Sequence, residues 1–422
     1  MLNRFLQLTF FSLAHWHPQP PTTLYQLPLL YKMTTGPELE LITSLRDYVA
    51  PAYRGSNTSV WHRLPITRRS AVFILLFLGN MGELRVLLTK RSSKLRNFPG
   101  HVALPGGKAD NGLESEWMVS RREMHEEIGL SSDDDSLAKL GISIEHVTLL
   151  PSYLSRTFSC VRPCVGFMKF SNEGEVEATI ASKLNLVLNP GESSSIFSCP
   201  LRDFLYPVVD EPPKEALERV SYHMKWGGIP WSLRSYTFLQ NNPNEVEWLK
   251  HIKDLSALED DELGEELDMS DKGRITPPNV TPLRSTSPCR SRSASPMRST
   301  SLQPKDRKKK QNLLSWGRLG SRTDEETNEK IYDVWGLTAN ILHDLSEIVY
   351  TRERIGQRQI GEEELIHSLY EFGHLMQRKE RSDAEVKLIH SSNTPASGES
   401  EFGFDLILPL EEFNRLKNMY KL

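Results

Sequence analysis

Residues 100–130 contain the pattern that most restricts what this chain can fold into, because a Gly-Gly turn there leads into a glutamate-rich helix. At 3.6 residues per turn, Glu123, Glu126 and Glu127 fall within an arc of about 100° on one face of that helix. Apolar side chains occupy roughly the opposite side, which gives the helix a face to pack. Gly129 follows the last turn, where a left-handed C-cap is expected. The stretch therefore predicts a packed helix that ends at a glycine and presents three carboxylates together.

Three carboxylates on one helix face repel one another, each close pair by about 4 kcal/mol at an effective dielectric constant of about 20. A bound divalent cation removes that cost, and hard oxygen ligands suit Mg²⁺ or Mn²⁺. The alternative is a solvated helix face, which is the usual fate of a charge run. Four features together oppose it, namely the Gly-Gly turn, Glu114, the Arg122-Glu123 pair and the terminal Gly129. We therefore predict a site for a divalent metal ion.

The order of these residues (glycine, glutamate, Arg-Glu, Glu-Glu, glycine) resembles the Nudix box. The resemblance implies an α+β fold, the Nudix fold, with a mixed β-sheet sandwiched between helices. It implies that the metal ligands are Glu123, Glu126, Glu127 and the carbonyl of Gly107. It also implies that Arg122 forms an ion pair with Glu126 and orients the carboxylates, so that Arg122, Glu126 and Glu127 count as catalytic residues. Glu114 is expected to brace the loop.

The residues before the box narrow the resemblance to the coenzyme A diphosphatase branch of the Nudix hydrolases. That branch has the pattern Leu-Leu-Thr-x-Arg-Ser, then an arginine, a glycine and Phe-Pro-Gly-Gly. Residues 87–107 match it at every fixed position except Leu104, which stands where the branch has phenylalanine. Glu114 lies seven positions after Gly107, one more than in the generic box, and the branch shares this longer loop.

Three basic residues flank the expected diphosphate site and are our predicted substrate-binding residues. Arg91 and Arg96 suit charge-assisted contacts to phosphate oxygens, and the alternative is that they are simple surface arginines. Lys108 follows the Gly-Gly pair and occupies the position of a glycine in the generic box.

A further catalytic candidate lies in the turn Asn189-Pro190-Gly191-Glu192. Members of the branch have a glutamate after such a turn, and in Nudix enzymes it often reaches the metals or acts as the base. Glu192 is the best match, although Ser193 follows it where the branch usually has valine. The alternative is an ordinary turn carboxylate.

Composition divides the rest of the chain, since only 38% of the 422 residues are hydrophobic and some of the chain is expected to be disordered. Residues 1–37 are a predicted disordered extension, within which Met33 is an alternative start of translation. Residues 38–350 are the predicted Nudix domain, and residues 351–422 are a predicted helical extension. A disordered insertion, acidic and then basic, is predicted to interrupt the domain at residues 241–328.

Sequence patterns also predict the main elements around the box. A helix is expected at residues 38–48, and apolar runs with turn residues predict hairpins from 71–78 with 84–88 and from 222–226 with 231–238. Strands are expected at residues 142–150 and 160–170. The residues Trp335-Gly336-Leu337-Thr338-Ala339 resemble the start of the helix that closes the domain in the branch, so the insertion is expected to lie inside the domain.

The sequence also gives expectations about binding partners and cellular location. The implied partner is a small nucleoside diphosphate derivative; a nucleic acid is not expected, nor is a membrane, because no run approaches the ~20 apolar residues of a span. The basic half of the insertion favours a polyanion or a protein partner, with a solvated linker as the alternative. Four cysteines without CxxC spacing, and no clear secretory signal, indicate an intracellular protein. We expect the cytoplasm, with mitochondrial, peroxisomal and nuclear locations as alternatives.

The sequence therefore predicts a Mg²⁺- or Mn²⁺-dependent diphosphate hydrolase. The branch resemblance implies cleavage of coenzyme A or acyl-CoA to adenosine 3′,5′-bisphosphate and 4′-phosphopantetheine. The alternatives are hydrolysis of a nucleotide sugar, a dinucleotide or an RNA cap, and a Nudix domain that binds a partner without catalysis. The complete set of metal carboxylates favours an enzyme.

Overall fold

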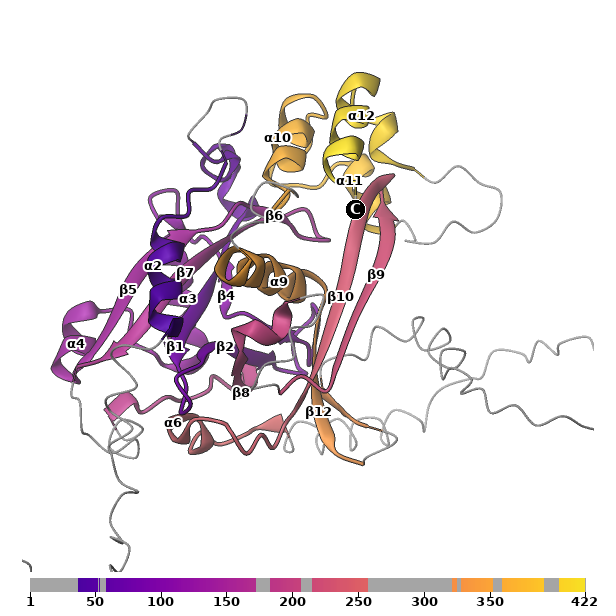
Figure 1. The fold of residues 1–422 in the computed structure, drawn as a ribbon. Helices are drawn as coiled ribbons and strands as arrows, with labels where there is room; N and C mark the ends of the chain where they lie inside the picture. Colours follow the sequence, from indigo (N-terminus) through magenta and orange to yellow (C-terminus); the bar gives the residue numbers. More distant parts are fainter. Residues whose placement is uncertain are drawn as a thin grey trace, which may run out of the picture.

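An eight-stranded mixed sheet forms the centre of the computed structural model (Figure 1). The structure describes residues 37–51, 53, 58–171, 183–205, 215–256, 321–324, 328–351, 359–390 and 402–421. The strands of the large sheet are β1 (Arg69–Leu78), β2 (Leu84–Arg91), β3 (Val102–Ala103), β4 (Gly106–Lys108), β5 (Ile142–Leu149), β6 (Tyr153–Leu154), β7 (Cys160–Phe170) and β8 (Ser193–Pro200). The main path runs β3–β2–β1–β7–β5, with β8 beside β2 and β4 beside β1. Strands β1 and β7 are parallel, whereas β1 and β2 form the predicted antiparallel hairpin.

Alternating side chains of β1 divide the apolar interior into two layers, as expected for a strand buried on both faces. Phe73, Leu75 and Phe77 join one cluster with α3 (Glu116–Ile128). Ile74 and Leu76 join the other cluster, with α2 (Pro37–Arg46) and α9 (Gly336–Tyr350). The predicted arrangement of a mixed sheet between helices is therefore confirmed.

A second sheet of four strands lies on the far side of α9 from the large sheet (Figure 1). Its strands are β9 (Glu218–Trp226), β10 (Ile229–Leu239), β11 (Ser321–Thr323) and β12 (Lys330–Trp335). Strands β9 and β10 form the second predicted hairpin. Strand β12 pairs with β10 over the register Ser235↔Trp335 to Leu239↔Ile331, so segments far apart in the sequence lie side by side.

The described fold extends past the predicted start of the insertion at residue 241. Residues 241–256 continue from β10 and include the short helix α6 (Glu247–Lys250). Trp248 and Leu249 are buried, and the buried carboxylate of Glu245 accepts hydrogen bonds from the amide and hydroxyl groups of Ser198 on β8. The prediction placed the boundary too early because these few apolar residues are followed at once by an acidic run. Residues 257–320 of the predicted insertion lie outside the described residues, as do residues 1–36 of the predicted extension 1–37.

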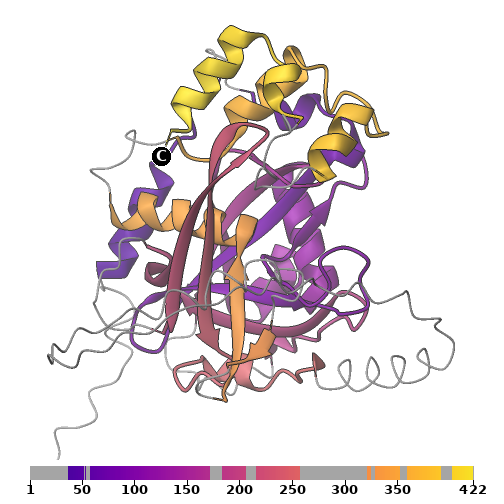
Figure 2. The same cartoon turned by 90° about the vertical axis from the view of Figure 1, so that its right-hand side faces the viewer.

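Helices of the C-terminal segment gather at one end of the molecule, where the tip of the β9–β10 hairpin reaches them (Figure 2). These are α10 (Glu363–Glu371), α11 (Asp383–His390) and α12 (Leu410–Met419). Gly227, at the hairpin tip, accepts a hydrogen bond from the amide of Phe404 at 2.8 Å, and Phe404 is fully buried. The remaining short helices are η1 (Val60–Arg63), η2 (Ile66–Arg68), α4 (Asp134–Lys139), η3 (Leu201–Phe204) and η6 (Phe404–Leu406). None of the described helices is long and apolar enough to cross a membrane.

Candidate active site

Helix α3 forms where the sequence predicts it and ends as predicted. Ser115 caps its start by accepting a hydrogen bond from the amide of Met118 at 3.2 Å. Gly129 ends it in the left-handed conformation, with φ of 78°. Met124 and Ile128 are fully buried against the sheet, as the apolar stripe predicts. The helix is therefore fixed at both ends and along one face, and its glutamates are presented from a rigid support.

Glu127 is the most buried of the three glutamates, with 7% of its surface exposed. One carboxylate oxygen accepts a hydrogen bond from the amide of Gly106 at 3.1 Å. The other accepts hydrogen bonds from the hydroxyls of Thr89 at 3.2 Å and Ser193 at 3.3 Å. Burial raises the pKa of Glu127 to about 7, although the Gly106 amide and the charge of Arg91 oppose the shift. Only neutral groups donate hydrogen bonds to this carboxylate. Its ionised form is therefore still disfavoured by burial.

Glu123 lies against the backbone of the Gly-Gly turn. A Cβ at Gly107 would come within 2.3 Å of the Glu123 carboxylate, so only glycine permits this approach. Burial raises the pKa of Glu123 to about 7; the charge of Arg122 opposes this shift, while the charges of Glu126 and Glu192 add to it. Glu126 is more open, with 43% of its side chain exposed.

Arg122 joins the loop of the box to its helix. Its guanidinium donates to the carboxylates of Glu123 at 3.2 Å and Glu126 at 3.1 Å. It also donates to the carbonyl of Lys108 at 2.8 Å and to the carboxylate of Glu114 at 2.9 Å. Glu114 in turn accepts a hydrogen bond from the amide of Asp110 at 2.7 Å, which confirms its expected place as a brace of the loop.

The turn that carries Glu192 is hydrogen-bonded to the end of α3. The amide of Asn189 donates to the carbonyl of Glu127 at 3.0 Å, and the amide of Val187 donates to the carbonyl of Ile128 at 3.0 Å. The side-chain amide of Asn189 then donates to the Glu192 carboxylate at 3.1 Å. This arrangement brings Glu192 close enough to Glu123 for its charge to raise the pKa of that carboxyl. The structure therefore places Glu192 with the box glutamates.

The three predicted substrate-binding residues are placed differently. Arg91 is half-buried; its charge acts on Glu127, and it donates to the carbonyl of Asn97 at 3.4 Å. Its Nε is buried without a hydrogen-bond partner among the residues that the structure describes. Arg96 is exposed in the loop between β2 and β3, and Lys108 is exposed while its carbonyl binds Arg122. The structure thus brings Arg91 to the glutamates and leaves Arg96 and Lys108 at the surface.

Two hydroxyl groups at this site were not singled out from the sequence. Thr89 lies within the Leu-Leu-Thr segment of β2, and Ser193 begins β8, and both donate to Glu127. A threonine among buried apolar residues is a signal that could have identified Thr89. Ser193 was noted only as a departure from valine, and its contact depends on the pairing of β8 with β2.

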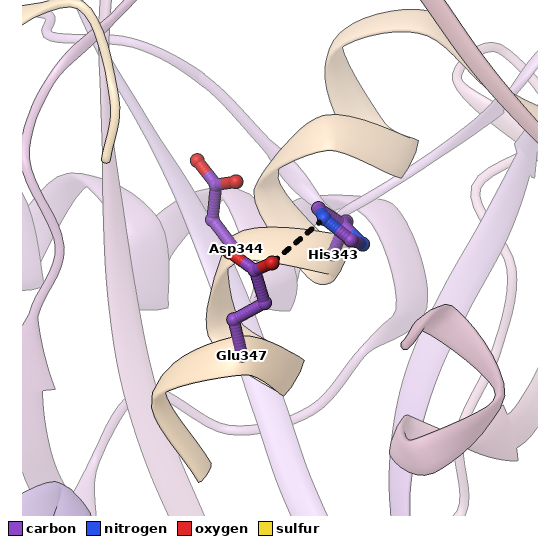
Figure 3. Close-up of side chains that lie close together, drawn as sticks. All are labelled: His343, Asp344 and Glu347. Atoms are coloured by element: carbon purple, nitrogen blue, oxygen red, sulfur yellow. Dashed lines mark ion pairs between the residues drawn. The ribbon is translucent and has the colours of Figure 1, made fainter. Parts of the chain in front are cut away.

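A group of potential metal ligands lies on α9 and was also not anticipated. The ligand atoms of His343, Asp344 and Glu347 lie within 4.8 Å of one another. Figure 3 shows the Glu347 carboxylate directed at the His343 ring, whose Nε2 is 3.4 Å away, while the Asp344 carboxylate extends away from the pair. Asp344 accepts a hydrogen bond from the hydroxyl of Tyr153 at 2.8 Å, and Nδ1 of His343 lies 2.9 Å from the carbonyl of Phe204. These side chains are already used in holding α9 to its neighbours.

Comparisons with known proteins identify the family to which this chain is similar. The family described as "NUDIX domain" matches residues 67–220. "Peroxisomal coenzyme A diphosphatase 1, peroxisomal" of Saccharomyces cerevisiae is 35% identical over 368 residues, which cover 83% of this chain and 89% of the yeast protein. "Nudix hydrolase 15, mitochondrial" of Arabidopsis thaliana is 36% identical over 181 residues, which cover 43% of this chain and 54% of that protein. Among solved structures, a C. elegans Ap4A hydrolase binary complex aligns at 20% identity with a TM-score of 0.23, over 32% of this chain and 82% of the other.

Proposed function

Because this chain belongs to the Nudix hydrolase family, and to its coenzyme A diphosphatase branch, we propose that it hydrolyses the diphosphate of coenzyme A or acyl-CoA with the help of a divalent metal ion. The observation that carries the chemistry is a pair of carboxylates, the buried Glu127 and the half-buried Glu123, each with a pKa raised to about 7. The name of the yeast relative, a coenzyme A diphosphatase, supports the choice of coenzyme A as substrate. A nucleotide sugar, a dinucleotide or an RNA cap remains the alternative substrate.

The residues of the box fit a hard divalent cation. Glutamate carboxylates and a backbone carbonyl are the oxygen ligands that Mg²⁺ and Mn²⁺ prefer. Glu123, Glu126, Glu127 and the carbonyl of Gly107 would hold the ion, and its charge would offset the cost of burying two carboxylates. When bound, the ion would offset the negative charge of the diphosphate and lower the pKa of a water molecule bound to it.

The remaining steps are carried by side chains of this chain. We assign Glu192 as the base that takes a proton from the attacking water, since Asn189 holds its carboxylate beside Glu123. The water oxygen forms a new bond to one phosphorus while the bridging P–O bond breaks, giving two phosphate monoesters. From coenzyme A, these products are adenosine 3′,5′-bisphosphate and 4′-phosphopantetheine.

Arg91 is our candidate for binding the diphosphate. Its buried Nε lacks a partner in the described part of the chain, and a phosphate oxygen is a suitable acceptor. We expect Arg91→Ala to lower kcat/KM by about 10- to 100-fold, the range expected for a hydrogen bond to a charged group. Arg96→Ala and Lys108→Ala should change it less than about twofold, because both side chains are exposed.

The direct test of the proposed function is an activity panel with purified protein. Coenzyme A, NADH, ADP-ribose and capped RNA are each incubated with Mg²⁺ or Mn²⁺, and the products are separated by chromatography. We expect coenzyme A to give the highest kcat/KM. Cleavage of none of the four would contradict a diphosphatase, and preference for another substrate would contradict the coenzyme A assignment alone.

The compartment is a further part of the proposal. The names of the yeast and Arabidopsis relatives place those proteins in peroxisomes and mitochondria. They favour these two alternatives over our first expectation of the cytoplasm. Microscopy of the full chain, with a fluorescent protein fused at either end in turn, distinguishes the three locations.

A further inference from the structure

Three rings form a row at the end of β2 that carries Arg91. The centroids of Phe98 and His101 are 5.5 Å apart, and those of His101 and Trp335 are 5.2 Å apart, with the rings tilted by 55° and 54°. Phe98 and His101 belong to the loop between β2 and β3, whereas Trp335 ends β12. The row therefore joins the loop before the box to the end of β12.

Phe98 has two properties that packing does not explain. Its side chain is 47% exposed, although it is a large aromatic group. Its backbone is left-handed, with φ of 52°, a conformation that is uncommon for residues other than glycine and costs energy. The loop is nevertheless fixed on both sides of it, since the carbonyl of Asn97 accepts from Arg91 and the amide of Arg91 donates to the carbonyl of His101 at 2.9 Å. A strained, exposed ring on a braced loop is typical of a contact with a ligand.

Arg91 connects this row of rings to the predicted diphosphate position. Its positive charge lowers the pKa of Glu127 on one side and the pKa of His101 on the other. Burial and the Arg91 charge lower the pKa of His101, so its ring is neutral at pH 7. A diphosphate bound by Arg91 would therefore have one of its two substituents next to the rings.

The backbone next to the rings borders open space. A Cβ added at Gly100, which precedes His101, would meet no atom within 4 Å, and the same is true at Gly336, which follows Trp335. Both glycines are left-handed, with φ of 71° and 64°. The loop and the start of α9 thus approach each other at the rings without filling the volume beside them.

We propose that Phe98 and Trp335, with the buried ring of His101 between them, form the binding surface for the purine ring of the substrate, with Phe98 as the residue that determines specificity for a nucleotide. This inference rests on the proposed diphosphatase activity and adds the position of the base. Flat bases stack on aromatic side chains whatever their hydrogen-bonding edge, so this surface selects for a base rather than for one base in particular. The pantetheine half of coenzyme A has no flat ring, and it extends from the diphosphate in the other direction.

The test uses the full chain and the substrate of the activity panel that it cleaves best. Phe98→Ala should raise KM about tenfold and leave kcat within about twofold, since loss of a stacked aromatic weakens base binding by about 5- to 150-fold. Phe98→Tyr should keep the parental KM, because it retains the ring. Met81→Ala is the matched control: Met81 is 53% exposed and lies in the β1–β2 turn, at the opposite end of β2 from Arg91, and this variant should behave as the parent.

Product inhibition shows which half of coenzyme A meets the rings. Phe98→Ala should weaken inhibition by adenosine 3′,5′-bisphosphate about tenfold and leave inhibition by 4′-phosphopantetheine unchanged. The reverse pattern, or an unchanged KM in Phe98→Ala, would overturn the inference while the parent enzyme still cleaves its substrate. A parent enzyme that cleaves no substrate in the panel would instead contradict the proposed function, and these two failures are therefore distinguishable.

Discussion

Glu127 and Glu363 are buried to the same degree, each with 7% of its surface exposed, yet their pKa values shift in opposite directions. Burial raises the pKa of Glu127 to about 7. Burial also disfavours the charge of Glu363, but the nearby His367 ring, the charge of Arg162, and hydrogen bonds from Ser152 and Ser59 lower its pKa well below the usual range. Equal burial therefore does not give equal electrostatics.

The difference lies in the partners that the chain supplies. Glu363, on α10, accepts hydrogen bonds from the amides of Val60 at 2.9 Å and Ser152 at 2.8 Å, and Arg162 lies 3.2 Å away as its cation. Glu127 has only an amide and two hydroxyls, and no lysine or arginine among the described residues forms an ion pair with it. One carboxylate joins the C-terminal segment to the domain, whereas the other is the one that we propose binds a divalent cation. A buried carboxylate indicates a functional site when the chain does not neutralise it.

The largest expected effect is a loss of activity, and of the two carboxylates only Glu127 should cause it when it is substituted. Glu127→Gln keeps the size of the side chain and removes the charge, so it should lower kcat/KM by at least about 100-fold, more than the loss of a residue that only supports a metal ligand. Steady-state kinetics with Mg²⁺ measures this. Glu116→Gln, on the same helix and paired with His62 instead, is the matched control and should stay within about twofold. A Glu127→Gln variant as active as the parent would show that Glu127, like Glu363, is not needed for catalysis.

The second effect is on stability and should be seen with the other carboxylate. Glu363→Gln leaves Arg162 buried without its counter-charge, so we expect a loss of roughly 3–5 kcal/mol in the free energy of unfolding. Urea denaturation measures this loss, and kcat at a temperature where the variant is folded should remain within about twofold. A variant as stable as the parent would show that Glu363 does not hold the C-terminal helices in place.

The pH dependence of stability should have opposite signs at the two sites. The lowered pKa of Glu363 means that its contribution is present above about pH 4.3, the ordinary glutamate value, and is lost as the pH falls further. The pKa of Glu127 is raised to about 7, so its contribution is complete below about pH 4.3 and is lost as the pH rises through 7.

Chelator-treated protein provides the measurement of this difference. Between pH 5 and pH 8 the parent should lose about 3 kcal/mol of unfolding free energy through Glu127, and Glu127→Gln should lose correspondingly less. Glu363→Gln should keep the parental slope over this range and differ from the parent in acid. Equal slopes for the parent and Glu127→Gln would contradict the raised pKa of Glu127.

Local patterns were sufficient to predict the parts of the fold that depend on neighbours in sequence. The helix of the box was predicted with its glycine end because both the apolar stripe and the cap lie within a few turns. The hairpins β1–β2 and β9–β10 were predicted for the same reason, since a short turn determines their pairing. The box glutamates, Arg122 and the brace Glu114 could be identified because their spacing alone brings them together.

The features that were missed depend on contacts between distant segments. Thr89 and Ser193 meet at Glu127 only because β8 pairs with β2, and His101 meets Trp335 only because β12 returns beside β10. Glu363 likewise finds Arg162 and Ser152 from the far end of the chain. No local pattern encodes such pairs, because the apolar surfaces that bring them together are assembled from many elements. The early boundary at residue 241 has the same origin, since the packing of α6 depends on β8.

The smallest effect concerns Asn189, which we infer positions Glu192 through the 3.1 Å hydrogen bond from its side chain. Asn189→Ala should lower kcat about tenfold and leave KM nearly unchanged, because the Asn189 side chain orients the Glu192 carboxylate without contacting the substrate. A structural role alone would predict the same loss whether or not Glu192 is present. The decisive measurement is therefore a double-mutant cycle, in which Asn189→Ala should have little further effect in the Glu192→Gln background. Additive losses would show that Asn189 acts through the turn and the carbonyl of Glu127 and does not position Glu192.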